Sequence, residues 1–509
     1  MFDGYKTIVH NSIKFKEVSM LWNFEQVSNV FSSVKSSILI DGKWGIERES
    51  LRVTPQGKLA LTEHPASFGN KLENTEITTD FSESQLELIT PPFTSVEETY
   101  EYLLNLQLKV EKELGEELLW PLSMPPILPA EEEIPIAKFE NSITGRENEI
   151  YRLGLATRYG KKMQMISGIH FNFSFGSELL DILYKRFGNK ISKREFIDKA
   201  YFATARNFLR YRWLLIYLFG ASPSIDSTFL PTIHQELKFI VKCCPECCNP
   251  INSYEKYATS LRVSRFGYSN SVQGKYSVSF NSLNDYIQGL KKLLSTKCAM
   301  FEKLGLYKNG KQIQLNGNIL QKESEFYSSI RLKQITTKGE RQLDALEKRG
   351  VKYAEVRIFD LDPFEKTGMS LNQMLFLQAF MLLCLFEESD PIDEKELIKI
   401  NKNHHLVALN GRKQNLMLYK YCGGNITLKK WGEEILEKLA FIAAVMDKGN
   451  SGTKYQECIA FELGKIKDVS LLPSSKILDE MGKRGEKYFE FGIRKAIEHS
   501  NPKVQSMVY

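Results

Sequence analysis

The strongest constraint on the fold comes from four short segments in which apolar and polar residues alternate strictly. In GIERESLRV, Glu47 and Glu49 share one side of an extended chain, because successive side chains of a strand point to opposite faces. The other segments are ESQLELIT, SGIHFNFSF and KYAEVRIF, at residues 83–90, 167–175 and 352–359. Each segment offers an apolar face to a core, so the sequence predicts strands whose opposite face carries charge.

Carboxylates and one imidazole would gather on that polar face if the four strands were neighbours. The predicted cluster consists of Glu47, Glu49, Asp80, Glu87, His170 and Glu355, where Asp80 begins the turn DFSES. Buried like charges are costly unless cations compensate them, and hard oxygen ligands favour Mg²⁺, for which Mn²⁺ can substitute. Because Mg²⁺ keeps several of its waters, these ligands predict roughly two or three ions. The alternative is a solvated strand face without metal, the usual explanation of an isolated Glu or Arg.

The charge balance and the apolar runs narrow the class of protein. Lys and Arg total 68 and Asp and Glu total 62, so the net charge is only +6 over 509 residues, which does not favour nucleic-acid binding. The first residues lack the apolar core of a secretory signal. The longest apolar run, Met374 to Phe386, is shorter than the about 20 residues of a membrane span. We therefore expect a cytoplasmic protein that binds neither nucleic acid nor membranes, and a buried helix at this run.

Helix and strand patterns are mixed along the chain without regular alternation, which favours an α+β fold over a doubly wound parallel sheet. Residue spacing predicts helix over 95–119 and 177–220, and further strand-like pieces occur at 274–281 and 312–318. After Pro363 the pattern is mainly helical. We expect a partly helical lead-in, a sheet region with the charged cluster, and a helical region packed on the same unit, at residues 1–41, 42–364 and 365–509.

Two other motifs have a simpler explanation than a ligand site. GLYKNGK, residues 305–311, has the glycine and lysine spacing of a phosphate loop, but Gln312 stands where Ser or Thr would bind magnesium. We expect its Tyr-Lys-Asn-Gly stretch to be a hairpin turn. CCPECC, from Cys243 to Cys248, has no second C-x-x-C half and no paired histidines nearby, so a cysteine-rich loop is favoured over a zinc site.

Longer motifs resemble one family, the proteobacterial-type glutamate–cysteine ligases, also called γ-glutamylcysteine synthetases. The shared motifs follow the family order from about residue 42 to 364: GIERESLRV, ITTDFSESQLELITP, WPLSMP, TGR, YRLGLATRYG, QMISGIHFNFS, YLFGASPS, YATSLR, GYSN and YAEVRIFDLDPF. The resemblance implies a fold related to glutamine synthetase, in which a curved antiparallel sheet forms a funnel surrounded by helices. It also implies ATP-dependent ligation of the L-glutamate γ-carboxylate to the L-cysteine amine through a γ-glutamyl phosphate, the first step of glutathione biosynthesis.

The resemblance further implies roles for individual residues. Its metal ligands match Glu49, Asp80 and Glu87 for one ion and Glu47, His170 and Glu355 for a second, with Glu47 and Glu355 able to share a third. Arg357 resembles the family's phosphate-contacting arginine. The family's cysteine pocket matches Arg262, Tyr151, Tyr268 and Tyr327. Feedback inhibition by glutathione is common in the family. The stretch after residue 364 is too short for an added ATP-grasp domain, so we do not expect the second step of glutathione synthesis.

Other functions are compatible with the residues alone. A related carboxylate–amine ligase could use another amine acceptor, since the pocket tyrosines leave the identity of the amine open. A metal-dependent phosphoesterase could use the same acidic cluster without forming a new bond. A non-catalytic binding protein is disfavoured, because every expected ligand is present in the sequence.

Overall fold

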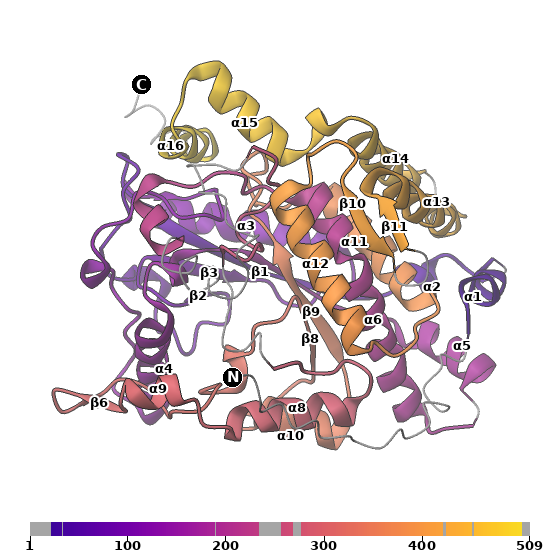
Figure 1. The fold of residues 1–509 in the computed structure, drawn as a ribbon, viewed down its shortest axis with the longest axis horizontal. Coiled ribbons are helices and arrows are strands. Elements are labelled where there is room, and N and C mark those ends of the chain that lie inside the picture. Colours follow the sequence, from indigo (N-terminus) through magenta and orange to yellow (C-terminus); the bar gives the residue numbers. More distant parts are fainter. Residues whose placement is uncertain are drawn as a thin grey trace, which may run out of the picture.

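The computed structural model describes most of the chain between residues 22 and 500 (Figure 1). The described ranges are 22–32, 34–188, 190–233, 256–267, 276–420, 424–449 and 452–500. Tyr268 and the predicted cysteine-rich loop Cys243–Cys248 lie outside the described residues.

A seven-stranded antiparallel sheet lies at the centre of the described chain, with helices packed around it (Figure 1). Its strands are hydrogen-bonded in the order β2-β3-β1-β5-β9-β8, and β4 pairs with the end of β1. The strands are β1 Gly42–Val53, β2 Ile77–Thr79, β3 Gln85–Ile89, β4 Leu118–Leu119, β5 Ile169–Phe175, β8 Ile330–Lys333 and β9 Tyr353–Phe359. The four predicted strands are therefore neighbours, and the predicted α+β class is confirmed.

The helices come both before and after the strands and are mostly longer than two turns. Those of the described chain are α1 Phe24–Phe31, α2 Ser37–Ile40, α3 Val96–Glu113, α4 Ile143–Tyr159, α5 Ser177–Phe187, α6 Lys193–Phe219, α8 Leu283–Ser295, α9 Ala299–Lys303, α10 Gln342–Arg349, α11 Leu371–Phe386, α12 Glu394–Asn410, α13 Leu428–Asp447, α14 Lys454–Lys467, α15 Pro473–Arg484 and α16 Tyr488–His499. The predicted helices near residues 95–119 and 177–220 are confirmed as α3, α5 and α6.

The apolar face of the sheet forms the main core. Leu86 of β3, Phe171 of β5 and Val356 of β9 are all fully buried there. Helix α3 packs on β1 and β3, helix α6 packs on β8 and β9, and α11 packs on both helices. Every residue of α11 from Gln373 to Phe386 is buried, which confirms the buried helix predicted from the apolar run.

Serine side chains mark where the helices of this core begin. Ser95 accepts hydrogen bonds from the backbone of the first turn of α3, Ser192 does the same for α6, and Ser370 does the same for α11. An N-cap hydroxyl satisfies backbone N–H groups that have no partner within the helix and contributes about 1 kcal/mol. These caps explain why each helix starts at its observed residue.

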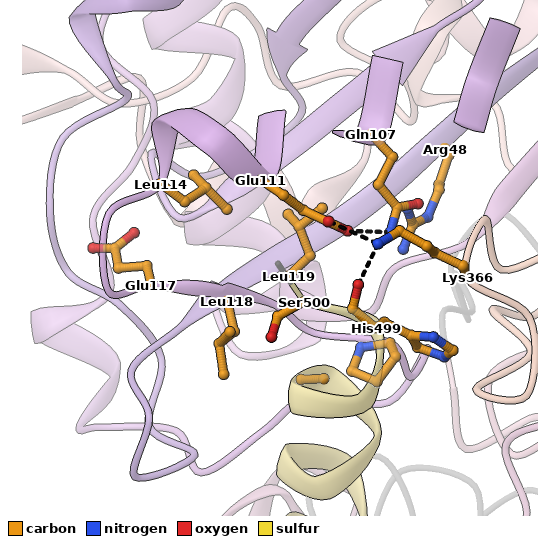
Figure 2. Close-up of a pocket in the computed structure, with 12 residues that line it drawn as sticks. Arg48, Gln107, Glu111, Leu114, Glu117, Leu118, Leu119, Lys366, His499 and Ser500 are labelled. Carbon is orange, nitrogen blue, oxygen red and sulfur yellow. Dashed lines mark hydrogen bonds and ion pairs between the residues drawn. The ribbon is translucent and has the colours of Figure 1, made fainter. Parts of the chain in front are cut away.

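The centre of β1 is also held from the apolar side of the sheet (Figure 2). Arg48, between the two glutamates of this strand, is 1% exposed and donates to Gln107 of α3. The Gln107 amide donates to Glu111, which pairs with Lys366 at 2.8 Å. The cavity beside these groups measures about 10 Å³, room for one water and too small for a substrate. The network ties β1 to α3 and to the chain after β9.

The proline-rich segment Trp120–Pro126 crosses the interior close to the ends of two central strands. All of its residues are buried. The Ser123 carbonyl accepts from Ser167 N at 2.9 Å, just before β5, and its hydroxyl accepts from Leu361 N at 2.7 Å, just after β9. Tyr488 of α16 contacts the Trp120 ring, with ring centres 6.0 Å apart. The segment therefore links the start of β5 and the end of β9 to helix α16.

Two strands predicted from sequence are wrong. The described part of the first, residues 276–281, is extended but pairs with no described strand. The Phe280 carbonyl accepts from the Arg206 guanidinium at 3.1 Å, and the Phe280 ring packs on Tyr286. Of residues 312–318 only the first belongs to a strand, because the Gln314 amide fills the turn by donating to Phe301 and Gly305 carbonyls.

Other local predictions had mixed outcomes. Strands β6 Tyr307–Lys308 and β7 Lys311–Gln312 form the predicted hairpin, and Asn309 and Gly310 adopt the positive φ values that a tight turn requires. The region after residue 364 is mainly helical, but it also contains a hairpin of β10 Met417–Lys420 and β11 Gly424–Thr427. The division of the chain at residue 364 stays a prediction. Among the described residues, no helix is both long and apolar enough to cross a membrane.

We predict that Gly492→Ala lowers the free energy of unfolding by about 1–3 kcal/mol. A methyl group at this position of α16 would overlap the ring of Trp120, which is fully buried and cannot move aside. Urea unfolding followed by circular dichroism measures the change. The matched control is Gly482→Ala in α15, where an added methyl group meets no atom within 4 Å. An equal loss of stability in both variants would contradict the packing of α16 on Trp120.

Candidate active site

Strand register places the predicted charged cluster on one face of the sheet. Glu49 lies opposite Glu87 in the β1–β3 pair, and Glu47 lies opposite His170 in the β1–β5 pair. The pairing of β5 with β9 brings Glu355 beside them. Side chains directly opposite one another in an antiparallel pair have Cβ atoms about 5 Å apart. The cluster is therefore a direct consequence of the pairing and of the alternation along each strand.

The imidazole of His170 lies among three of these carboxylates. Its Nδ1 is 2.9 Å from Glu47 Oε2 and 3.5 Å from Glu355 Oε1, and its Nε2 is 3.7 Å from Glu49 Oε1. The Asn172 amide donates to the other Glu47 oxygen at 2.9 Å. His170 itself is only 4% exposed. These contacts fix the orientation of the ring and of Glu47.

Asp80 joins the cluster from the turn after β2. Arg152 of α4 donates to the carbonyl groups of Thr79, at 3.3 Å, and of Asp80. The Arg152 guanidinium also lies over the Phe139 ring, 4.6 Å from its centre. Arg152, which is half-buried, fixes the turn by holding two successive carbonyls, so the Asp80 side chain has a defined position at the edge of the cluster.

Basic side chains approach the cluster from β8 and β9. Arg357 Nη1 donates to Glu355 Oε1 at 2.7 Å, and Lys333 Nζ lies 3.6 Å from Glu355 Oε2. Arg331, on the same face of β8, donates to the Ser324 carbonyl at 2.8 Å. We did not predict Arg331 or Lys333, because β8 has only four residues. The sequence feature that could have located these two residues is the alternation in IRLK, in which Ile330 and Leu332 are buried.

These cations favour charge on the carboxylates near β9. Burial opposes a negative charge on Glu355, but Arg357 and Lys333 outweigh it and hold the pKa of Glu355 well below its usual range. Burial and the neighbouring Glu355 also act against charge on Glu47, yet the hydrogen bond from His170 lowers its pKa on balance. Both side chains are therefore ionised at neutral pH.

The carboxylates near β3 have the opposite environment. Burial raises the pKa of Glu49, and Asp80 adds to the effect. Burial, together with the charge of Glu47, raises the pKa of Glu87 well above its usual range. This part of the cluster thus has more negative charge than the nearby side chains neutralise.

The donor set fits divalent cations. Ligand atoms of Glu47, Glu87 and His170 all lie within 4.8 Å of one another. Glu355 Oε2 and Asn172 Oδ1 are buried and have no hydrogen-bond partner among the described residues. Carboxylate oxygens with an imidazole are ligands that suit Mg²⁺ or Mn²⁺, which would also neutralise the excess charge near β3.

A second group of residues surrounds the open side of the cluster. Arg262, 8% exposed, donates through Nη2 to the Arg357 carbonyl at 3.2 Å. Its Nη1 is buried without a hydrogen-bond partner among the described residues. Burial raises the pKa of Tyr151 and of Tyr327, so both hydroxyls are protonated at neutral pH and can donate hydrogen bonds. The arrangement offers a cation and two hydroxyls to a carboxylate ligand.

Both groups line one cavity of about 410 Å³, a size suited to small substrates. The structure brings together here the predicted site residues that it describes: Glu47, Glu49, Asp80, Glu87, Tyr151, His170, Arg262, Tyr327, Glu355 and Arg357. Tyr268 lies outside the described residues. The cavity also includes side chains that sequence reasoning did not select, namely Arg152, Gln164, Lys322, Ser324, Arg331 and Lys333.

Comparisons with known proteins point to one family. A family model described as glutamate-cysteine ligase matches residues 27–407. The chain is 54% identical over 479 residues to the glutamate–cysteine ligase of Clostridium acetobutylicum, covering 94% of this chain and 100% of that protein. It is 43% identical over 456 residues to the glutamate–cysteine ligase of Pseudomonas paraeruginosa, covering 90% of this chain and 85% of that protein.

Solved structures give the same result. A glutamate–cysteine ligase from Francisella tularensis, in complex with AMP, matches with a TM-score of 0.82 and 34% identity over 92% of this chain and 91% of that chain. A bifunctional glutathione synthetase from Pasteurella multocida matches with a TM-score of 0.71 and 29% identity over 93% of this chain. The match covers 53% of that longer chain.

We predict that Glu87→Gln stabilises the metal-free protein by about 1–2 kcal/mol, because it removes a half-buried carboxylate whose charge its neighbours disfavour. Added Mg²⁺ should raise the unfolding temperature of the wild type more than that of the variant. Thermal unfolding in EDTA and in excess Mg²⁺ measures both effects. The control is Glu63→Gln, whose side chain is 79% exposed and whose ion pair should contribute little. A Glu87→Gln variant that is less stable than wild type in EDTA would argue against excess negative charge here.

Proposed function

The chain belongs to the glutamate–cysteine ligase family, and we propose that it joins the γ-carboxylate of L-glutamate to the amine of L-cysteine, converting ATP to ADP and phosphate. The product would be γ-glutamylcysteine, and the reaction would be the first step of glutathione synthesis. The observation that carries the proposal is one cavity that contains both the acidic cluster and the Arg262 group. The AMP complex of the related Francisella tularensis structure supports a nucleotide substrate.

The chemistry explains why such a site needs both positive and negative groups. A carboxylate is a poor acyl donor, because oxide is a poor leaving group. Transfer of the γ-phosphoryl group of ATP to the glutamate carboxylate would give γ-glutamyl phosphate, from which phosphate can leave. Phosphoryl transfer depends mainly on positioning and on neutralising charge. The cysteine nitrogen would then attack the acyl carbon, lose a proton and release phosphate.

We assign the acidic cluster to roughly two or three Mg²⁺ ions, for which Mn²⁺ can substitute. Glu49, Asp80 and Glu87 would hold one ion, on the side of the cluster with excess negative charge. Glu47, His170 and Glu355 would hold a second, and Glu47 and Glu355 could share a third. The bound ions would supply neutralisation of the phosphate oxygens.

Arg357 is assigned to the transferring phosphoryl group. Its Nη1 bonds to Glu355, so the guanidinium has a fixed orientation in the cavity, while 19% of the side chain remains exposed. Lys333 lies on the opposite side of Glu355 and adds a second positive charge. Two cations around one carboxylate can neutralise phosphate oxygens without a glycine-rich phosphate loop.

The amine substrate is assigned to the Arg262 group. The Arg262 guanidinium would bind the cysteine carboxylate, and Tyr151 and Tyr327 would add hydrogen bonds, with Tyr268 completing the pocket. We also propose that glutathione inhibits the enzyme at this cavity, since it contains the γ-glutamylcysteine unit.

The direct test measures ADP release and γ-glutamylcysteine formation with Mg²⁺, glutamate and cysteine. We expect both products from the wild type and neither from Glu47→Gln, which should still fold because Gln keeps the shape of the side chain. EDTA should stop the wild-type reaction. ADP release without γ-glutamylcysteine would indicate another acceptor or a phosphoesterase. Wild-type turnover by Glu47→Gln would remove Glu47 from the metal site.

A separate prediction concerns Arg357→Lys. Lysine keeps the charge but not the planar fork of the guanidinium, so we expect kcat to fall by about 100-fold with little change in KM for cysteine. Steady-state kinetics with varied cysteine measures the two parameters. The control is Arg494→Lys, on α16 and remote from the cavity, where kcat should be unchanged. A change confined to the cysteine KM would place Arg357 in the amine pocket instead.

A further inference from the structure

Gly168 contacts one residue of each of the two groups that line the cavity. It precedes β5 and contacts Glu49 of the acidic cluster on one side and Arg262 of the amine pocket on the other. We propose that Gly168 is a positioning residue that sets the place of the Arg262 guanidinium relative to the metal-binding carboxylates. The proposal rests on the proposed function and assigns to Gly168 a part in selecting amines that carry a carboxylate.

On the first side, two hydrogen bonds join Gly168 to Glu49. The Gly168 N–H donates to Glu49 Oε2 at 2.8 Å, and the Glu49 N–H donates to the Gly168 carbonyl at 3.0 Å. The other Glu49 oxygen faces His170 Nε2 at 3.7 Å. The backbone of Gly168 therefore has a fixed position relative to the acidic cluster.

On the second side, the Arg262 guanidinium occupies the space where a side chain at position 168 would lie. A Cβ atom added to Gly168 would overlap Nη2, Cζ and Nε of Arg262. Gly168 is not among the glycines with positive φ, so the requirement for glycine is one of space and not of backbone conformation. The Gly168 backbone and the Arg262 guanidinium can therefore lie this close only because residue 168 has no side chain.

Two further contacts hold the guanidinium against Gly168. Its Nη2 donates to the Arg357 carbonyl at 3.2 Å, and its Nη1 lies 3.9 Å from Asp360 Oδ1. The Asp360 carboxylate is in turn fixed by Ser222 Oγ at 2.7 Å and Ser260 Oγ at 3.0 Å. Nη1 has no hydrogen-bond partner among the described residues.

The position of the Arg262 guanidinium determines where the amine substrate is bound. For an amine substrate that carries a carboxylate, such as cysteine, binding of that carboxylate at a set distance from the γ-glutamyl group holds the nitrogen in position to attack. A displacement of about 1 Å can reduce such a reaction by about 100-fold. Gly168 contacts both Arg262 and Glu49. This one residue therefore sets the distance between the bound carboxylate and the γ-glutamyl group.

The test is Gly168→Ala. Alanine keeps the N–H that bonds to Glu49, and the overlapping group is the end of a flexible side chain, so the fold should survive while the guanidinium moves. We expect KM for cysteine to rise about 10- to 100-fold, the loss of one charged hydrogen bond. KM for glutamate should change little. The matched control is Gly482→Ala, for which all parameters should equal those of the wild type.

Hydroxylamine separates positioning from a general structural defect. It attacks the same γ-glutamyl carbon through nitrogen and releases phosphate, but it has no carboxylate for Arg262 to bind. We expect Gly168→Ala to form γ-glutamyl hydroxamate at close to the wild-type rate. An equal loss with cysteine and with hydroxylamine would overturn the proposal. A wild type that forms neither product would instead refute the proposed function.

A double-mutant cycle tests whether Gly168 acts through Arg262. In the Arg262→Ala background, adding Gly168→Ala should raise the cysteine KM by less than 2-fold, since the displaced group is already absent. Additive effects would overturn the proposal. If Gly168→Ala does not fold, Asp360→Asn tests the position of the Arg262 guanidinium, since Asp360 also contacts that group. It should raise the cysteine KM without slowing hydroxamate formation, and an unchanged KM would overturn the proposal.

Discussion

The concentration of negative charge on one face of the central sheet is the constraint on which the rest of the structure depends. Carboxylates on β1, β3 and β9 meet around His170 because those strands are neighbours in register. Such a face can exist only if the opposite face is strongly held, and the helices α3, α6 and α11 supply that core. The hydrogen-bond network of the buried Arg48 holds β1 from the apolar side of the sheet, at the point between its two glutamates (Figure 2).

The charge is not evenly compensated across the sheet. Near β9, Arg357 and Lys333 hold the pKa of Glu355 well below its usual range. Near β3, burial and neighbouring carboxylates raise the pKa of Glu87 well above its usual range. Cations are therefore needed most at the β3 side, whereas the β9 side already presents fixed positive groups. Within a single cavity, fixed positive groups thus lie beside Glu355, and uncompensated negative charge lies beside Glu87.

Much of this site could be predicted from sequence, because period-two alternation determines which side chains share a face. That argument located Glu47, Glu49, Glu87, His170 and Glu355 once the strands were taken as neighbours. It failed for residues 276–281, where Phe280 packs on α8 and the segment pairs with no strand of the described chain. It also missed Lys333, since a four-residue edge strand is too short to show a period. The position of Asp80 depends on Arg152, a contact between distant segments that no local pattern reveals.

The acidic cluster and the amine pocket are connected through the backbone of β9 as well as through Gly168. The Arg357 side chain bonds to Glu355 in the acidic cluster, while its carbonyl accepts from Arg262 in the amine pocket. One residue thus contacts the group assigned to the metal ions and the group assigned to the cysteine carboxylate. Strand β9 is paired on both sides, by β5 and β8, and the Arg357 N–H donates to the Ser329 carbonyl at 3.0 Å, so the backbone of this residue is held in place. Rigidity of the central strand would therefore keep the proposed acyl phosphate and the attacking amine at a constant separation, which a two-step ligation in one cavity requires.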